Sequence, residues 1–295
     1  MFRVRPRAPP RRRHDEFEGE VIMNTNRSSY SLGAALGSAI VLALCAPAHA
    51  ADIYSGGLKG GYDVPPPPPS DRGIYFKGYI GQANPDVGNI WTEDYATNTF
   101  SVHHKDIKSS PLYGLGVGWQ ARHWLRFDLT GEYRGDALFV GHDSYPGSGF
   151  PAGTNEYTAD IKSWLGLANA YIDMGNWCGF TPYIGAGIGF ASINVSGMKD
   201  INVPTGGVAF GGDKTTTNFA WAIHAGMSYD VTPQMAVDLS YRYTDLGNAS
   251  SGAVYDYTGA YAHSGVHIKD ITSNDVLFGV RYKLQREPVS YQAMK

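Results

Sequence analysis

Cysteine is nearly absent from this chain, which contains only Cys45 and Cys178 among its 295 residues. Cys45 lies in a segment that we expect to be removed, so the mature protein would keep a single thiol. A single thiol cannot form an internal disulfide, and this excludes the class of disulfide-rich secreted domains.

Long apolar runs are absent as well. The most apolar stretch, residues 32–44, is shorter than the roughly 20 residues that a membrane-spanning helix needs. The sequence also contains no phosphate-binding loop, no zinc-ligand spacing and no dinucleotide-binding fingerprint. We therefore expect neither a helical membrane protein nor an enzyme that depends on one of these cofactors, and we assign no cofactor.

An excess of positive charge is missing too. Residues 1–50 hold seven basic and four acidic side chains, so the chain from Ala51 onward carries 17 Lys and Arg against 23 Asp and Glu, a net charge of −6. Nucleic-acid-binding domains usually carry a basic patch or stripe. Nucleic acid is therefore not an expected partner.

A secretory signal is present in residues 23–50. Arg27 supplies its positive charge, residues 32–44 form its apolar centre, and Ala48-His49-Ala50 is a typical cleavage sequence. We expect cleavage between Ala50 and Ala51, which predicts an exported mature protein.

Two further segments flank the signal. Residues 1–22 resemble no export signal, and we interpret them as an upstream extension produced by a start codon placed too early, with a nucleic-acid-binding arm as the alternative. Residues 51–72 include the proline run 65–69 and are expected to form a semi-rigid periplasmic linker. A lipidated Cys45 is the alternative end of the signal, but Leu44 is too large for the preceding position.

After residue 72 the sequence repeatedly alternates between apolar and polar or small side chains. Leu125, Phe127 and Leu129, for example, alternate with Arg126 and Asp128. A period of two is typical of β-strands, and runs of about ten residues can cross a bilayer as tilted strands. Eight such segments occur, at residues 74–80, 113–120, 125–134, 163–173, 184–190, 219–229, 235–244 and 275–284.

The connections between these segments alternate in length. Short connections fall at residues 122–124, 174–181 and 231–234, and long ones at residues 83–110, 135–161, 194–216 and 246–273. Short turns at one end and long loops at the other are typical of outer-membrane barrels, whose short turns lie in the periplasm. This arrangement predicts a periplasmic N-terminus and four extracellular loops.

The two sides of the predicted strands differ in charge, because one side is almost uncharged and the other carries both signs. Strands in a bilayer must close into a barrel, since every backbone polar group needs an internal partner. We therefore predict an all-β fold, an eight-stranded antiparallel transmembrane up-and-down β-barrel over residues 73–284, with a tail at 285–295. Its interior is expected to hold a network of paired charges formed by Lys77, Arg126, Asp128, Glu132, Arg134, Asp238, Arg242, Asp275, Arg281 and Lys283, with Asp173 on the same face.

Three motifs carry a family resemblance: residues 167–173, 181–189 and 241–247. In this order they resemble motifs of the porin-like eight-stranded outer-membrane proteins of alphaproteobacteria, which are similar in fold to the OmpA transmembrane domain. That family includes rhizobial major surface proteins and haemin-binding members. The resemblance implies an outer-membrane location and insertion by the barrel assembly machinery, although the tail at 285–295 lacks the terminal aromatic residue typical of such chains.

Candidate chemistry is sparse. His142-Asp143-Ser144 contains the residue types of a hydrolase triad, but consecutive side chains cannot generally converge as a triad requires, so no catalytic residue is assigned. His103, His104, His263 and His267 could bind a metal or haem iron if the first and fourth loops meet, although solvated loop histidines are commoner. Inward-facing His224 is expected to be a hydrogen-bonded interior residue, and Cys178 an incidental thiol.

These observations predict a structural, surface-exposed protein of the outer membrane rather than an enzyme. The barrel would anchor its loops at the cell surface, support envelope integrity, and contact membrane lipid and lipopolysaccharide. The alternative is a narrow channel or a barrel that captures a small ligand such as haemin, and an outer-membrane enzyme is the third possibility. An extracellular partner that binds the loops is possible under each of these interpretations.

Overall fold

The computed structural model describes residues 72–91, 101–146 and 152–284, all within the compact unit formed by residues 57–295. None of the described residues forms a helix long and apolar enough to cross a membrane. The predicted signal, its cleavage site, most of the linker and the tail lie outside the described residues. The strands are β1 (Gly73–Trp91), β2 (Ser101–Ile107), β3 (Ser110–Arg122), β4 (Leu125–Tyr145), β5 (Gly153–Asp173), β6 (Phe180–Asn202), β7 (Gly207–Gly211), β8 (Lys214–Asp230), β9 (Met235–Ser250), β10 (Val254–Asp256), β11 (Tyr261–His263) and β12 (His267–Lys283).

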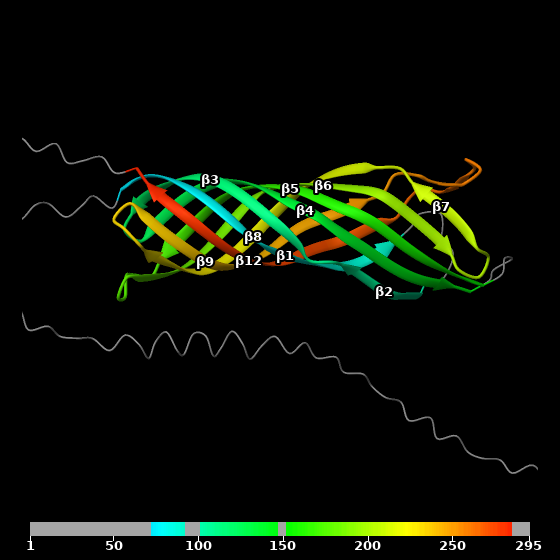
Figure 1. The fold of residues 1–295 in the computed structure, drawn as a ribbon, viewed down its shortest axis with the longest axis horizontal. Helices are drawn as coiled ribbons and strands as arrows, with labels where there is room; N and C mark the ends of the chain where they lie inside the picture. Colours follow the sequence, from blue (N-terminus) through cyan, green and yellow to red (C-terminus); the bar gives the residue numbers. More distant parts are fainter. Residues whose placement is uncertain (1–71, 92–100, 147–151, 285–295) are drawn as a thin grey trace, which may run out of the picture. The chain divides into compact units, whose positions relative to one another are not determined.

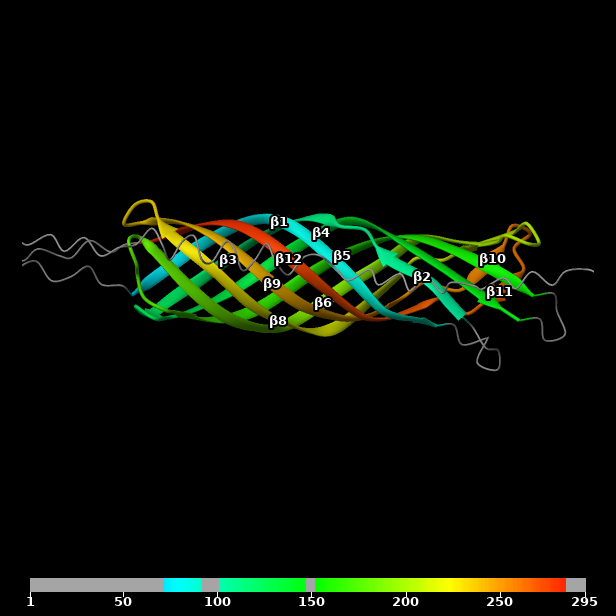
Figure 2. The ribbon, with the colours of Figure 1, turned by 90° about the horizontal axis from the view of Figure 1, so that it is seen from below.

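Eight of these strands pair edge to edge in a closed antiparallel ring (Figures 1 and 2). The order around the ring is β1, β3, β4, β5, β6, β8, β9 and β12. The first and last strands close it, with pairing that runs from Tyr75↔Lys283 to Trp91↔His267. The predicted eight-stranded up-and-down barrel is therefore confirmed.

The two ends of the barrel differ. At one end the strands are joined by tight connections, at residues 123–124, 174–179 and 231–234, and β1 begins and β12 ends there as well (Figure 1). We call this the turn end and the opposite one the far end. The short strands β2, β7, β10 and β11 lie toward the far end, where they pair with β4, β6 and one another.

The strands are much longer than the sequence pattern predicted. Those of the ring have 13 to 23 residues rather than about ten. The pairing of β4 with β5 continues from Leu125↔Ile172 to Tyr145↔Gly153, so the expected loop at 135–161 is mostly strand. Describing the four long connections as loops was therefore wrong over much of their length. The reason is that backbone pairing continues where the outward side chains are no longer apolar.

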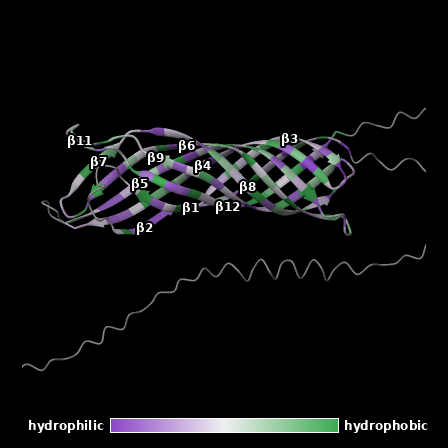
Figure 3. Cartoon of the chain, turned by 180° about the vertical axis from the view of Figure 1, so that it is seen from behind, coloured by the Kyte–Doolittle hydropathy of each residue, from purple (hydrophilic) through white to green (hydrophobic). Residues whose placement is uncertain are grey.

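The outward side chains form an apolar band around the turn-end half of the ring. Leu115, Leu129 and Trp164 expose 74, 62 and 63% of their surface. Figure 3 shows hydrophobic colours on β3 and β8, whereas hydrophilic colours dominate β2. Broad apolar exposure of this kind requires a non-aqueous neighbour, and lipid provides it.

Glycines on the inward side make room for aromatic rings. Tyr75 pairs with Gly118 and Tyr79 with Gly114 across β1 and β3. A Cβ atom added at either glycine would lie 2.1 Å from the ring of the tyrosine opposite. At these two positions, inward glycines therefore make room for the long side chains opposite them.

Candidate functional site: the barrel interior

Four charged residues form a closed network in the middle of the barrel. Glu132 and Arg134 come from β4, Arg242 from β9 and Asp275 from β12, and all four are buried. Successive side chains of a strand point to opposite faces of the sheet. These four residues lie on the same face of their strands as the other buried residues, so they point into the barrel.

Each arginine of this network contacts both carboxylates. Arg242 Nη2 lies 2.7 Å from Glu132 Oε2 and 2.8 Å from Asp275 Oδ2. Arg134 Nε lies 2.9 Å from Glu132 Oε1, and Arg134 Nη2 lies 2.7 Å from Asp275 Oδ2. Buried charges are tolerated when they are paired and hydrogen-bonded, and this geometry meets both conditions.

A second layer of charge lies nearer the turn end. Asp128 accepts hydrogen bonds from Tyr75 Oη at 3.2 Å and Asn169 Nδ2 at 2.8 Å, and Lys77 Nζ lies 3.6 Å from its Oδ2 atom. These contacts join β1, β4 and β5 across the interior. The layer therefore connects these three strands through the interior, between the central network and the turn end.

Two further ion pairs complete this layer. Arg126 Nε lies 2.9 Å from Asp173 Oδ1, and Arg281 Nη2 lies 3.2 Å from Asp238 Oδ1. The guanidinium of Arg126 also lies 4.8 and 4.5 Å from the ring centroids of Tyr171 and Tyr183. Cation–π contacts of this kind replace part of the lost hydration of the charge.

The structure places nine of the ten predicted network residues within these contacts, and the exception is Lys283. Its side chain is 35% exposed at the turn end and lies 3.6 Å from Asp230 Oδ1. The expectation that Lys283 belongs to the interior network is therefore wrong. It occupies the last position of β12, where the ring opens to solvent.

Uncharged polar residues belong to the same interior, although the sequence-based prediction assigns an interior role only to His224 among them. His224 Nε2 lies 3.1 Å from Asn169 Oδ1, which confirms the expected hydrogen-bonded interior role. Tyr75, Asn169 and Ser273 were missed as members, although Ser273 Oγ donates to Asp275 Oδ1 at 2.5 Å. Tyr75 and Asn169 lie on the inward side of their predicted strands, which was the available signal, whereas Ser273 lies in the connection 246–273 that was predicted to be a loop.

Above the charged layers, toward the far end, the interior becomes apolar. Leu165 and Leu167 on β5 point inward and are 2 and 3% exposed. They belong to a cluster of buried side chains that also includes Val87, Ile90, Ile107, Ala137, Phe139, Tyr157, Ala159, Ile161, Ala191, Ile193, Val195, Met198, Ala220, Ala222, Leu246, Ala249, Val266, Ile268 and Ile271. Most of this core comes from segments that we expected to be loops.

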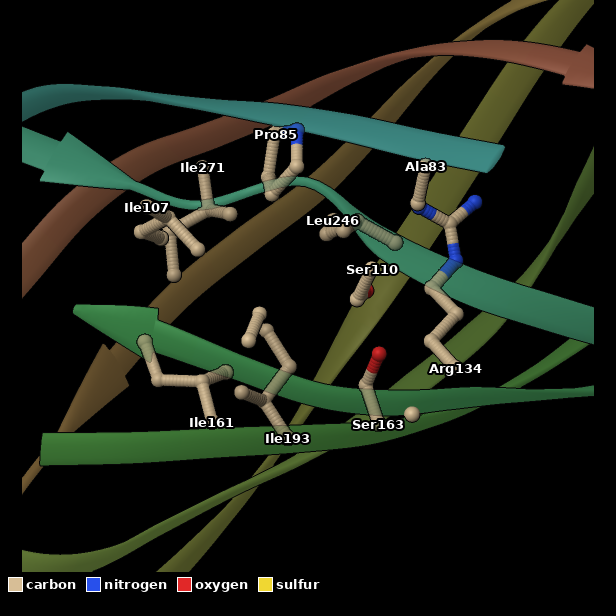
Figure 4. A pocket seen from close by; sticks show the side chains of 12 residues that line it. Ala83, Pro85, Ile107, Ser110, Arg134, Ile161, Ser163, Ile193, Leu246 and Ile271 are labelled. Carbon is tan, nitrogen blue, oxygen red and sulfur yellow. The ribbon is translucent and has the colours of Figure 1, made fainter.

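A small cavity lies where the two kinds of interior meet (Figure 4). Arg134 and Ser163 lie on one side of it, and Ile107, Ile161 and Ile271 on the other. Its free volume of about 20 Å³ is close to what one water molecule needs. The side chains that line this cavity therefore leave room for about one water molecule.

The candidate triad residues do not converge. Asp143 is buried and accepts a hydrogen bond from Tyr157 Oη at 3.0 Å, while its strand neighbours His142 and Ser144 lie on the opposite side of β4. Burial raises the pKa of the Asp143 carboxyl above its ordinary value, and the hydrogen bond from Tyr157 partly offsets this. Ser144 Oγ instead lies 2.6 Å from His103 Nε2.

The four loop histidines do not form one site. His103 contacts His142, with ring centroids 5.4 Å apart, whereas His263 lies 3.1 Å from Asp200 on β6 and His267 lies beside Trp91. No group of three His, Cys, Asp or Glu side chains suited to a metal ion occurs in the described part of the chain. Cys178 is an exposed free thiol in a connection at the turn end.

The sequence of this chain is similar to those of known outer-membrane proteins. The family model described as the outer membrane protein beta-barrel domain matches residues 36–283. An uncharacterized protein of Brucella melitensis is 32% identical over 248 residues, which cover 75% of this chain and 84% of that protein. Outer membrane protein PagN of Salmonella typhimurium is 27% identical over 72% of this chain and 90% of its own length. The crystal structure of OprG from Pseudomonas aeruginosa covers 74% of this chain and 98% of its own, with a TM-score of 0.47 and 13% identity.

Proposed function

Because the chain belongs to the outer membrane protein β-barrel family, and is thus a protein of the outer membrane, we propose that it serves as a non-conducting surface anchor. The barrel holds its far end outside the cell, and the turn end lies in the periplasm. Its contribution is structural: it displays the extended far-end strands and supports envelope integrity.

One observation carries this proposal: the interior is filled by two successive kinds of packing. Glu132, Arg134, Arg242 and Asp275 pair across the barrel at one level, and a buried apolar cluster that includes Phe139 and Ile193 follows toward the far end. An ion moving through the barrel would have to separate the buried pairs and then cross an apolar layer. Both steps are costly, because the charges would lose their partners and the ion its hydration.

Planar bilayers containing the purified barrel test the proposal. We expect no steady conductance at voltages where a known porin, added as a positive control, conducts. A large, stable and voltage-independent conductance from the monomer would overturn the proposal and favour the narrow-channel alternative.

A deletion strain tests the structural role itself. Loss of the protein is expected to increase the sensitivity of cells to detergent, and expression of the unmodified gene should restore resistance. An unchanged deletion strain would argue against a contribution to envelope integrity. The haemin-binding alternative gains no support from the described residues, because His103, His263 and His267 contact different partners.

The partners we propose follow from this location. The apolar band around the turn-end half contacts membrane lipid, and the strands just beyond it meet lipopolysaccharide on the outer side. Insertion requires the barrel assembly machinery, even though the last described strand, β12, is followed by a further tail. An extracellular ligand of the far end is compatible with the same arrangement.

A further inference from the structure

The turn end of the barrel contains an open polar cavity that the anchoring role does not use. It has a free volume of about 250 Å³ and is lined from several sides of the ring, by Gln120 on β3, Asp173 on β5, Ser228 on β8, and Arg281 and Lys283 on β12. A water molecule occupies about 30 Å³ in the liquid, so the cavity is large enough for a small solute. We call this cavity the vestibule.

The acidic groups of the vestibule already have basic partners. Asp173 accepts from Arg126 Nε at 2.9 Å and from Gln120 Nε2 at 3.3 Å, and Asp230 lies 3.6 Å from Lys283 Nζ. Both carboxylates are therefore at least partly neutralised by cations from other strands. A cationic ligand would have to compete with these existing pairs.

Hydrogen-bond donors, by contrast, remain unused. Arg281 lines the vestibule and is only 4% exposed, and its Nη2 group donates to Ser228 and Asp238. Its Nε–H has no partner among the described residues, and neither does Nη2 of Arg126 behind Asp173. Asp238 has an oxygen without a partner as well, but this residue does not line the vestibule.

A further cation, Lys283, lies at the mouth together with a histidine. Lys283 is partly exposed and can make two further hydrogen bonds beside its contact with Asp230, and exposed His123 lines the same opening. A ligand entering here would meet Lys283 and His123 first and the guanidinium of Arg281 deeper. Guanidinium and ammonium donors are well suited to the oxygens of carboxylates and phosphates.

We propose that the vestibule is a periplasmic binding site for a small oxyanion, namely a phosphate or carboxylate group. Arg281 supplies the buried donor, and Lys283 supplies the mobile charge that captures the anion at the mouth. The ligand enters and leaves from the periplasm only, because the charged layers close the vestibule on its inner side. Binding of the anion rests on this cavity alone, whereas its entry from the periplasm only rests on the closed interior of the proposed function, so the two proposals can fail separately.

Binding can be measured with the full mature chain in lipid nanodiscs. Inorganic phosphate is titrated at constant ionic strength and its ³¹P line width is recorded, with acetate as a competitor that represents the carboxylate source. We expect saturable broadening that acetate reverses if the site accepts both groups. Broadening that acetate leaves unchanged would restrict the site to phosphate.

Variants at the mouth decide whether the vestibule is responsible. Lys283→Gln removes a cation outside the buried network, and it should weaken phosphate binding about tenfold, which corresponds to about 1.4 kcal/mol. His123→Gln should weaken it less. Lys269→Gln, on the far-end part of β12, is the matched control and should bind like the unmodified protein.

Two results would contradict the proposed binding site. One is the absence of saturable broadening in the unmodified barrel. The other is equal phosphate affinity in Lys283→Gln and Lys269→Gln, which would place any binding elsewhere on the surface. The heat-dependent shift of each folded barrel in gel electrophoresis verifies that all variants are folded before they are compared.

Discussion

Arg242 and Glu132 meet in the middle of the barrel although their strands are not neighbours in the ring: Arg242 Nη2 on β9 lies 2.7 Å from Glu132 Oε2 on β4. The contact connects opposite walls through the interior. Backbone ladders hold adjacent strands together, whereas this pair holds the ring together across its diameter.

Arg242→Ala should strongly destabilise the barrel, by about 3–5 kcal/mol, because Glu132 and Asp275 would each lose a buried partner. Urea unfolding in lipid vesicles, followed by tryptophan fluorescence, measures the change. Lys269→Ala, which alters an exposed lysine on β12 near Trp91, is the control and should cost less than about 1 kcal/mol. Similar losses of unfolding free energy in both variants would contradict the burial of Arg242 between Glu132 and Asp275.

Gly118→Ala should destabilise the barrel by about 1–3 kcal/mol, since the new Cβ atom would overlap the ring of Tyr75. Gly131→Ala is the matched control, because nothing lies within 4 Å of a Cβ atom added there. In the double variant that combines Tyr75→Leu with Gly118→Ala, the smaller leucine side chain should leave room for the new Cβ atom. The same unfolding assay applies, and equal stability of the two single variants would contradict the packing of Tyr75 on Gly118.

Leu129→Arg should cost about 2–4 kcal/mol, because Leu129 is 62% exposed on the outward side within the apolar band. Leu138 lies farther along the same strand and is 44% exposed. Leu138→Arg should be nearly neutral if this position lies beyond the hydrocarbon. If both variants lose about 2–4 kcal/mol, the membrane boundary lies farther toward the far end. If both are as stable as the unmodified protein, Leu129 does not face lipid.

The far end should be accessible from outside intact cells. A short epitope inserted after Thr258, in the exposed turn between β10 and β11, should be labelled by antibody on whole cells. The same epitope inserted after Pro233, in the turn between β8 and β9, should be labelled only after permeabilisation. The reverse pattern would invert the topology and place the vestibule outside the cell.

Much of this architecture follows from the order of residues along single strands. Side chains alternate between the two faces of a strand, so Leu129 and Asp128 must point to opposite sides wherever the strand is placed. The mixed charge on one side and the apolar residues on the other identify the interior and the lipid face. The number of strands and the closed barrel follow from the same pattern, because a bilayer tolerates no unpaired strand edge.

Other features depend on which strands become neighbours and how far their pairing continues. Leu165 and Leu167 belong to the apolar core because segments expected to be loops, which include Phe139 and Val195, form strands and supply the other walls of the core. Lys283 lies on the inward face of β12. It is the last residue of the strand, however, and there its side chain remains partly exposed to solvent beside Asp230.

The pairing of Arg242 with Glu132 likewise joins residues 110 positions apart in the chain. Alternation indicates that both side chains point inward, but it carries no information on how deep each lies in the barrel. That depth is set by the register of every intervening strand pair. The sequence alone therefore determined the faces of the strands, and the tertiary structure decided the partners, because contacts across the interior depend on the accumulated register around the ring.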